Sequence, residues 1–281
     1  MDASVFLAVL AAAAFHAGWN ALLKVRLEPM MAMSLISTAC GIVALPFVPL
    51  VGLPLPAAWP FIVTSLALHL VYYTALAEAY RAGDLGQVYP IARGSAPLMT
   101  AAVSTTFLGE RLGLIGWSGI VVLVCGILLI SLHGGRDLAR LDRRAIGFAF
   151  FTAVTICGYS LVDGIGARTA GSAHSYSVML FLLDGVMMAV FALLRNGWAT
   201  VTDMTRHWKA AFIGGTLSLV AYWIAIWAMT VAPIALVAAL RESSVLFGAA
   251  IAVIFLKEPL RPSRIAAAGL IVAGLVLIRL H

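Results

Sequence analysis

Two arginines lie in the middle of long apolar stretches of the sequence. They are Arg93 and Arg241, 148 positions apart. A charged side chain that faces hydrocarbon at the centre of a membrane costs roughly 2.5 to 3.5 kcal/mol on insertion scales, so both arginines should face the protein interior. A guanidinium binds carboxylates and phosphates through paired hydrogen bonds. The two residues therefore predict an anion-binding site, although an internal ion pair with the adjacent Glu242 is a rival role for Arg241.

Aromatic and small polar residues repeat at helical spacing around these arginines and in other apolar stretches. Tyr89 shares a predicted helix face with Arg93, and His69 is followed by Tyr72 and Tyr73. A cavity with aromatic walls, a few polar groups and a guanidinium suits a small ligand with an anionic end, of which an amino acid is the simplest. The predicted substrate-binding residues are Trp19, Asn20, His69, Tyr72, Tyr73, Tyr89, Arg93, Tyr159, Tyr222, Trp223, Trp227, Arg241 and Ser243. Arg93 is the residue expected to bind the substrate carboxylate.

Four further titratable residues in the apolar stretches are candidates for proton coupling. They are His16, Glu78, Asp163 and Asp184. A lone buried histidine is more often neutral and hydrogen-bonded, and Glu78 can instead be solvated or paired with Arg81. Asp163 and Asp184 are the better candidates for buried carboxylates, because they lie within the sixth and seventh predicted spans.

The sequence gives no indication of a metal site, a cofactor or a catalytic centre. Its six histidines are scattered, and its three cysteines fall in three separate apolar stretches without paired spacing. We therefore expect a protein that is not an enzyme and that needs no cofactor and no metal.

The composition places these residues in a membrane protein. Hydrophobic residues make up 63% of the 281 positions and charged residues 11%, and the mean hydropathy is +1.04. Since a span needs about twenty mainly apolar residues, the sequence predicts ten transmembrane helices. Their approximate bounds are 3–23, 31–51, 59–79, 85–107, 114–132, 145–165, 175–194, 210–230, 234–255 and 264–278. Pro97 and Pro90 predict a break in the fourth span, with no counterpart in the ninth.

The ten spans form an internal duplication. When residues 85–130 are aligned with residues 233–278, thirteen of the forty-six positions are identical, among them the two arginines. Such a repeat is typical of transporters whose substrate site lies between two halves. The predicted organisation is a first repeat over residues 1–134, a basic linker over 135–144 and a second repeat over 145–281.

The basic residues predict the orientation of the chain in the membrane. Outside the spans, thirteen of sixteen lysines and arginines fall in the loops after spans 1, 3, 5, 7 and 9. Basic loops mark the cytoplasm, so both termini are expected in the periplasm. Because each repeat has five spans, the second must enter the membrane in the opposite sense. The expected fold is therefore an all-α membrane protein with two inverted five-helix repeats around a central cavity, and the net charge of +6 reflects topology rather than nucleic-acid binding.

Two related motifs carry a resemblance to a known family. Phe107–Arg111 closes the fourth span, Phe255–Pro259 closes the ninth, and glycine-rich spans follow both. The chain thereby resembles the paired EamA-type domains of the drug/metabolite transporter superfamily. The resemblance implies ten helices, alternating access and export of amino acids and related metabolites across a bacterial inner membrane. Glu110 and Glu258 in these motifs are expected to be structural, capping the next helix or pairing with a neighbouring basic residue.

Taken together, these features favour a carrier of small metabolites, with amino acids as the first candidates. Uniport, exchange and proton antiport remain open. The alternatives are a cationic drug or multidrug exporter, which Asp163 or Asp184 could serve, and an enzyme that acts on a lipid-linked phosphate. The expected partners are a small-molecule substrate and the lipid bilayer, with a monomer or a homodimer as the oligomeric state. Gly269 and Ala273 could pack within the fold or between subunits.

Overall fold

The first repeat consists of five spans built from helices and short helical turns. A computed structural model describes residues 1–22, 28–82, 85–132, 143–257 and 262–281, without the side chains of 21–22, 80–82, 85–90, 131–132 and 255–256. One short turn, η1, divides the second span, and another, η2, precedes the third. The elements are α1 (Ala3–Leu22), α2 (Pro29–Ala44), η1 (Leu45–Phe47), α3 (Val48–Val51), η2 (Pro56–Ala58), α4 (Trp59–Ala82), α5 (Leu85–Phe107) and α6 (Gly113–Leu132).

The second repeat follows the same order after the predicted linker, of which only the last two residues are described. Its elements are α7 (Arg143–Thr169), α8 (Ala173–Asn196), α9 (Ala199–Val231), α10 (Ile234–Arg241), α11 (Ser244–Leu256) and α12 (Pro262–Leu280). Helix α9 contains non-helical backbone at His207, so its membrane-spanning part follows that kink, as the predicted span at 210–230 requires.

The described helices confirm an all-α, multi-pass membrane protein. Nine segments are long and apolar enough to cross a membrane, and they coincide with nine of the ten predicted spans. The remaining predicted span is α5, which is long enough but is made more polar by Arg93, two prolines and several hydroxyl residues. Those polar residues are the reason why hydropathy alone does not detect the span.

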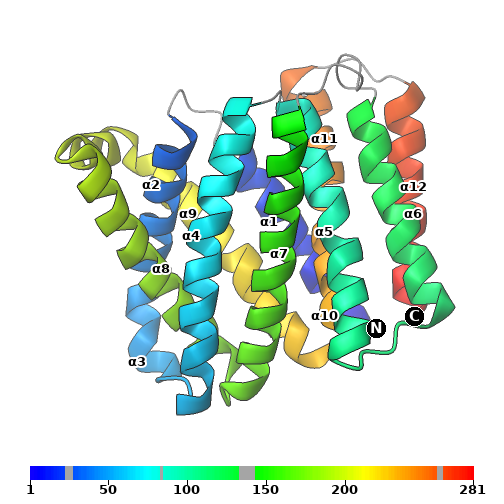
Figure 1. The fold of residues 1–281 in the computed structure, drawn as a ribbon, viewed down its shortest axis with the longest axis horizontal. Helices are drawn as coiled ribbons and strands as arrows, with labels where there is room; N and C mark the ends of the chain where they lie inside the picture. The colour runs from blue at the N-terminus through cyan, green and yellow to red at the C-terminus, as the bar shows by residue number, and fades with distance from the viewer. Residues whose placement is uncertain (23–27, 83–84, 133–142, 258–261) are drawn as a thin grey trace.

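The two repeats are arranged pseudosymmetrically and in opposite senses. Helix α1 packs against α9, and the related helices α7 and α4 pack against each other in the same way. Helix α2 pairs with its counterpart α8, and α6 with α12. Both termini lie at one face, from which α1 starts, whereas α7 starts at the opposite face (Figure 1). This is the inverted arrangement that the odd number of spans per repeat predicts.

Glycines allow the closest of these helix contacts. A Cβ atom added to Gly274 of α12 would lie 2.6 Å from the backbone nitrogen of Leu123 in α6, and one added to Gly126 would lie 2.8 Å from that of Ile271. Gly126 and Gly274 are repeat-related positions, so the α6–α12 contact is itself pseudosymmetric. Gly269, by contrast, is exposed, and a Cβ atom there would meet nothing within 4 Å.

The ninth span, not the fourth, is broken. Helix α5 is continuous from Leu85 to Phe107 despite Pro97, which contradicts the expected break. The ninth span instead divides at Glu242 and Ser243, where two backbone amides bond three residues back, to Ala239 and Leu240. A proline removes only one backbone hydrogen bond, and packed neighbouring helices can hold the helix together around it. At the break, the carboxylate of Glu242 pairs with Arg93 of α5.

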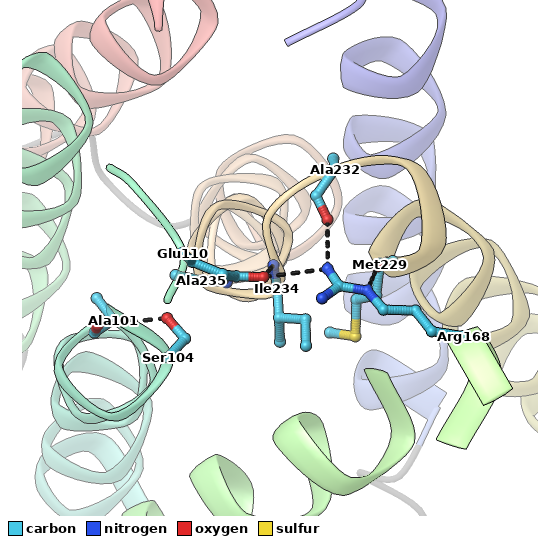
Figure 2. Close-up of polar contacts among 8 residues, drawn as sticks. All are labelled: Ala101, Ser104, Glu110, Arg168, Met229, Ala232, Ile234 and Ala235. Atoms are coloured by element: carbon cyan, nitrogen blue, oxygen red, sulfur yellow. Dashed lines mark hydrogen bonds and ion pairs between the residues drawn. The ribbon is translucent and has the colours of Figure 1, made fainter. Parts of the chain in front are cut away.

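A cluster at the face of the termini fixes the start of α10 (Figure 2). The Glu110 carboxylate accepts hydrogen bonds from the backbone N–H groups of Ile234, at 2.8 Å, and Ala235, at 3.3 Å. Arg168 pairs with the same carboxylate at 3.0 Å, and it donates to the carbonyls of Met229, at 2.8 Å, and Ala232, at 3.1 Å. We call Glu110, Arg168 and the α9–α10 turn the clamp.

The clamp shows Glu110 in a structural position, as expected, but with different partners. Glu110 caps α10, a helix of the other repeat, and pairs with Arg168 rather than with Arg111. A carboxylate is favourable at a helix N-terminus and an arginine at exposed C-terminal carbonyls. The clamp therefore ties the first repeat to both sides of a turn in the second. Glu258 lies outside the described residues.

Candidate functional site

A cavity opens between the two repeats. It holds about 580 Å³ of space free of protein atoms, including its opening. Its lining side chains come from six long helices and from α10: His16, Trp19, Met33, Ile36, Ser37, His69, Tyr72, Tyr73, Tyr159, Phe181, Ser218, Tyr222 and Arg241. Seven of these thirteen residues belong to the substrate-binding set predicted from the sequence, and His16 belongs to the predicted coupling set.

Aromatic rings form most of the wall. The imidazole of His69 stacks on Tyr159, with ring centroids 4.5 Å apart and an interplanar angle of 23°. Tyr72 and Tyr222 approach Tyr159 edge-on, at 5.5 and 5.9 Å. His69 is held by Ser65, whose hydroxyl and carbonyl oxygens lie 3.1 and 2.9 Å from its Nδ1. Such a wall offers flat apolar surfaces with polar edges to a ligand.

Arg241 brings a positive charge to this wall. It is the last residue of α10, so its side chain lies where the helix dipole is negative and favours a cation. Its guanidinium carbon lies 4.5 Å from the ring centroid of Tyr222, a cation–π contact. In the part of the chain that the structure describes, Arg241 has no carboxylate within ion-pair distance. Its guanidinium also hydrogen-bonds the Tyr159 hydroxyl in the same wall, so it is positioned to meet an anion in the cavity.

Arg93 is placed differently, although it occupies the repeat-related position. It is 2% exposed and is not among the lining residues. Its Nε atom pairs with Glu242 at 2.6 Å, and its Nη2 atom lies 3.0 Å from Nε2 of His16 and donates to the Ser244 hydroxyl at 3.4 Å. The ion pair considered for Arg241 is therefore made by Arg93, and it joins α5 to the break in the ninth span.

His16 connects this ion pair to the cavity wall. Its Nδ1 accepts a hydrogen bond from the indole Nε1 of Trp19 at 3.2 Å, while its Nε2 faces the Arg93 guanidinium. Trp19 and Arg93 are both donors, so a protonated imidazole, which is itself a donor at both nitrogens, fits neither contact. The arrangement thus favours neutral His16.

The two buried aspartates differ in how fully they are hydrogen-bonded. Asp163 is completely buried and accepts from the hydroxyls of Tyr176, at 2.9 Å, and Tyr222, at 2.5 Å. Asp184 accepts from the Tyr73 hydroxyl at 3.1 Å, and its other oxygen has no hydrogen-bond partner. Neither has a cation within ion-pair distance among the described side chains.

Among the described side chains, the other predicted site residues do not line the cavity. Asn20 donates to the His16 carbonyl, and Ser243 donates to the Leu240 carbonyl. Trp223 donates to His174 at 2.9 Å, and Trp227 packs against the apolar core. Glu78 is partly buried near the end of α4. The side chain of Tyr89 lies outside the described residues.

Six residues near the centre were not among the predicted site residues. Met33, Ile36, Ser37, Phe181 and Ser218 line the cavity, and Glu242 neutralises Arg93. Apolar residues in apolar spans carry no signal of their own, and a single serine carries little. The sequence does single out Glu242, because the repeat-related position in the first half is occupied by an uncharged residue, Gly94. A charge that appears in only one of two duplicated spans marks where the halves differ in role.

Comparisons with known proteins agree with the duplication. A family model described as EamA-like transporter family matches residues 3–132 and 143–280. Spermidine export protein MdtI of Klebsiella pneumoniae subsp. pneumoniae is 36% identical over 70 residues, which cover 25% of this chain and 64% of that protein. The protein of the same name from Shigella flexneri is 35% identical over 68 residues, covering 24% of this chain and 62% of its own. The match thus spans less than two thirds of these relatives.

A solved crystal structure has the same fold. It superposes with a TM-score of 0.79 and covers 98% of this chain and 95% of its own, at 17% sequence identity. At this identity the similarity concerns the fold alone.

Proposed function

The chain belongs to the EamA-like transporter family, and from that premise we propose that it carries a small zwitterionic metabolite across the membrane. An amino acid is the simplest substrate of this kind. The two repeats would rock about the cavity and expose it to either side in turn.

One observation carries the proposal, namely that the cavity contains an arginine without a carboxylate partner in the described part of the chain. Arg241 lies over Tyr222 at 4.5 Å among aromatic side chains. A guanidinium of this kind suits a substrate carboxylate, and the aromatic wall suits a modest organic body. We assign Arg93, by contrast, to holding Glu242, in place of the carboxylate contact expected from the sequence.

Export of a polyamine or another organic cation is the second candidate, favoured by the name of the matching relatives and by Asp163 and Asp184. Arg241 argues against it. Two unit charges about 6 Å apart repel by roughly 3 kcal/mol at an effective dielectric constant of about 20. Membership of a transporter family argues against the third candidate, an enzyme for lipid-linked phosphates.

Counterflow in proteoliposomes tests the proposal. Labelled amino acids and labelled spermidine would be offered to wild type, Arg241→Gln, Arg241→Lys and the control Arg195→Gln, whose side chain is exposed at the end of α8. We expect saturable exchange of an amino acid that Arg241→Gln abolishes, because losing one partner of a buried charge pair costs about 2 to 5 kcal/mol. Arg241→Lys should retain part of the exchange, and Arg195→Gln all of it. Exchange of spermidine alone would favour the cation exporter instead.

The basic-loop bias supports a periplasmic location for the face that carries both termini. We propose a bacterial inner membrane as the setting, in line with the family resemblance noted in the sequence. The clamp then lies on the periplasmic side, and the loops after spans 1, 3, 5, 7 and 9 lie in the cytoplasm.

A further inference from the structure

Asp184 is a buried carboxylate whose charge is not fully compensated. It lies in the middle of α8, is 4% exposed, and accepts a hydrogen bond from Tyr73, with the Ser37 hydroxyl also interacting with it. Its Oδ1 atom is buried without a hydrogen-bond partner. A buried charge without a cation is costly, by several kcal/mol even after local relaxation, unless something compensates it. Asp163 has no such deficit, since two tyrosine hydroxyls bond its two oxygens.

Asp184 is connected to the cavity through two lining residues. The Ser37 hydroxyl donates to the Tyr73 hydroxyl at 3.2 Å, and Tyr73 donates to Asp184 at 3.1 Å. Each hydroxyl oxygen in such a chain is polarised by the carboxylate behind it. Because Ser37 and Tyr73 both line the cavity, they present electron-rich oxygens to any ligand there.

The polarised hydroxyls and Arg241 lie on different parts of the same wall. The ring centroid of His69 is 6.0 Å from that of Tyr73 and 6.0 Å from that of Tyr222, over which Arg241 is stacked. One imidazole ring therefore separates a region that favours a cation from a region that favours an anion. A small zwitterion carries its two charges on one short body.

We propose that Asp184, acting through Tyr73 and Ser37, forms a subsite that recognises the ammonium group of the substrate. The inference rests on the proposed function and adds to it the second of the two charged groups. Tyr73 and Ser37 contact the ammonium, and Asp184 is a positioning residue that supplies the negative charge. The subsite selects α-amino acids over the corresponding acids without the amino group.

A competition experiment tests this selectivity. Counterflow of each labelled amino acid that wild type exchanges is inhibited with the unlabelled amino acid or with its des-amino acid, for example phenylalanine or 3-phenylpropionate. Wild type should prefer the amino acid at least tenfold. Asp184→Asn should weaken inhibition by the amino acid about tenfold, leave inhibition by the des-amino acid nearly unchanged, and so abolish the preference. Counterflow at equal pH on both sides needs no proton gradient, so a loss of proton coupling alone would not produce this result.

Two further variants make the result specific. Asp163→Asn removes an equally buried carboxylate and should keep the preference. Tyr73→Phe removes the contacting hydroxyl but keeps Asp184, and it should reduce the preference as Asp184→Asn does. If Asp184→Asn is inactive with every competitor, the preference is measured with Tyr73→Phe, by ligand-induced shifts in melting temperature.

The outcomes separate the two claims. A preference that survives in Asp184→Asn, or in Tyr73→Phe where the first variant is inactive, overturns the ammonium subsite while leaving the carrier intact. If wild type exchanges no amino acid, the proposed function fails, and the subsite falls with it.

Discussion

At the scale of single residues, the two duplicated arginines have taken different roles because their surroundings differ. Arg93 is paired with Glu242 and shielded from the cavity, whereas Arg241 faces the cavity and stacks on Tyr222. Arg93 therefore links the two repeats, whereas Arg241 is a candidate ligand contact. The difference follows from one carboxylate, present in the ninth span and absent from the fourth.

The Arg93–Glu242 pair yields a stability prediction. Arg93→Gln leaves Glu242 buried without its cation, and breaking a buried pair in this way costs about 3 to 5 kcal/mol. We expect a clear fall in melting temperature in detergent. Glu242→Gln added to Arg93→Gln should restore most of it, because a neutral pair needs no compensating charge. Equal melting temperatures for wild type and Arg93→Gln would show that the ion pair contributes nothing.

The sequence anticipates much of the cavity wall, for a physical reason. Charged and aromatic polar residues are costly in lipid, so their presence in spans indicates an interior position, and Tyr72, Tyr159 and Arg241 are found there. The choice between Arg93 and Arg241 depends on which one meets Glu242, and that is a contact between spans. Composition and spacing within one span do not encode it.

At the scale of helices, the clamp is a polar connection between the two repeats at the face of the termini. Glu110 belongs to the first repeat, whereas Arg168 and the α9–α10 turn belong to the second. If the repeats separate at the face of the termini, the bonds to Ile234 and Ala235 are lost. We therefore propose that the clamp helps to hold this face closed.

Glu110→Gln should open that face more often. The amide keeps the size of the side chain but loses the charge that holds Arg168 and caps α10, and caps of this kind contribute about 0.5 to 2 kcal/mol. In a cysteine-free background carrying Ser218→Cys in the cavity wall, we expect faster labelling by an impermeant maleimide from the face of the termini. Arg111→Gln, an exposed neighbouring charge, is the control and should label at the wild-type rate. An unchanged labelling rate in Glu110→Gln would show that the clamp does not control access to the cavity from this face.

The α6–α12 contact gives a second prediction at this scale. Gly274→Val places side-chain atoms where Leu123 backbone already lies, at 2.6 Å from the new Cβ. Overpacking of this kind costs about 1 to 3 kcal/mol and more where backbone must move. Gly269→Val, on the exposed side of the same helix, should leave the melting temperature within a degree or two of wild type. Equal effects of the two substitutions would contradict the packing described here.

The positions of the helices could be predicted from the sequence, but the breaks within them could not. Long apolar runs fix the spans because lipid requires them, and nine spans meet that criterion in the described chain. The break at Glu242 and Ser243 depends on a tertiary ion pair, and the continuity of α5 across Pro97 depends on its neighbours. Local sequence rules predicted a break in the fourth span, where there is none, and no break in the ninth span, where there is one.

At the scale of the whole molecule, the two inverted repeats form a central cavity whose wall draws on helices of both repeats. The arginine at position 279 donates to the carbonyl of Met1, so the chain ends meet at one face. The helices on either side of the basic linker, α6 and α7, end and begin at the opposite face (Figure 1). Orientation is thus a property of the whole molecule that its charge distribution predicts.

Cysteine labelling tests the orientation. Leu53 and Trp198 are exposed, at 68% and 82%, in loops after the second and seventh spans. In a cysteine-free background expressed in intact bacteria, Leu53→Cys should react with an impermeant maleimide from the periplasm. Trp198→Cys should react only after the cells are permeabilised. The reverse pattern would invert the orientation and place the termini in the cytoplasm.

We propose that Arg241, and not Arg93, binds the substrate carboxylate. The most direct test compares amino-acid counterflow in Arg241→Gln with that in the double variant Arg93→Gln/Glu242→Gln, which neutralises the buried pair together. We predict that the first variant loses saturable exchange and that the second retains it. Exchange that survives in Arg241→Gln but is lost in the double variant would contradict the account and return the carboxylate contact to Arg93.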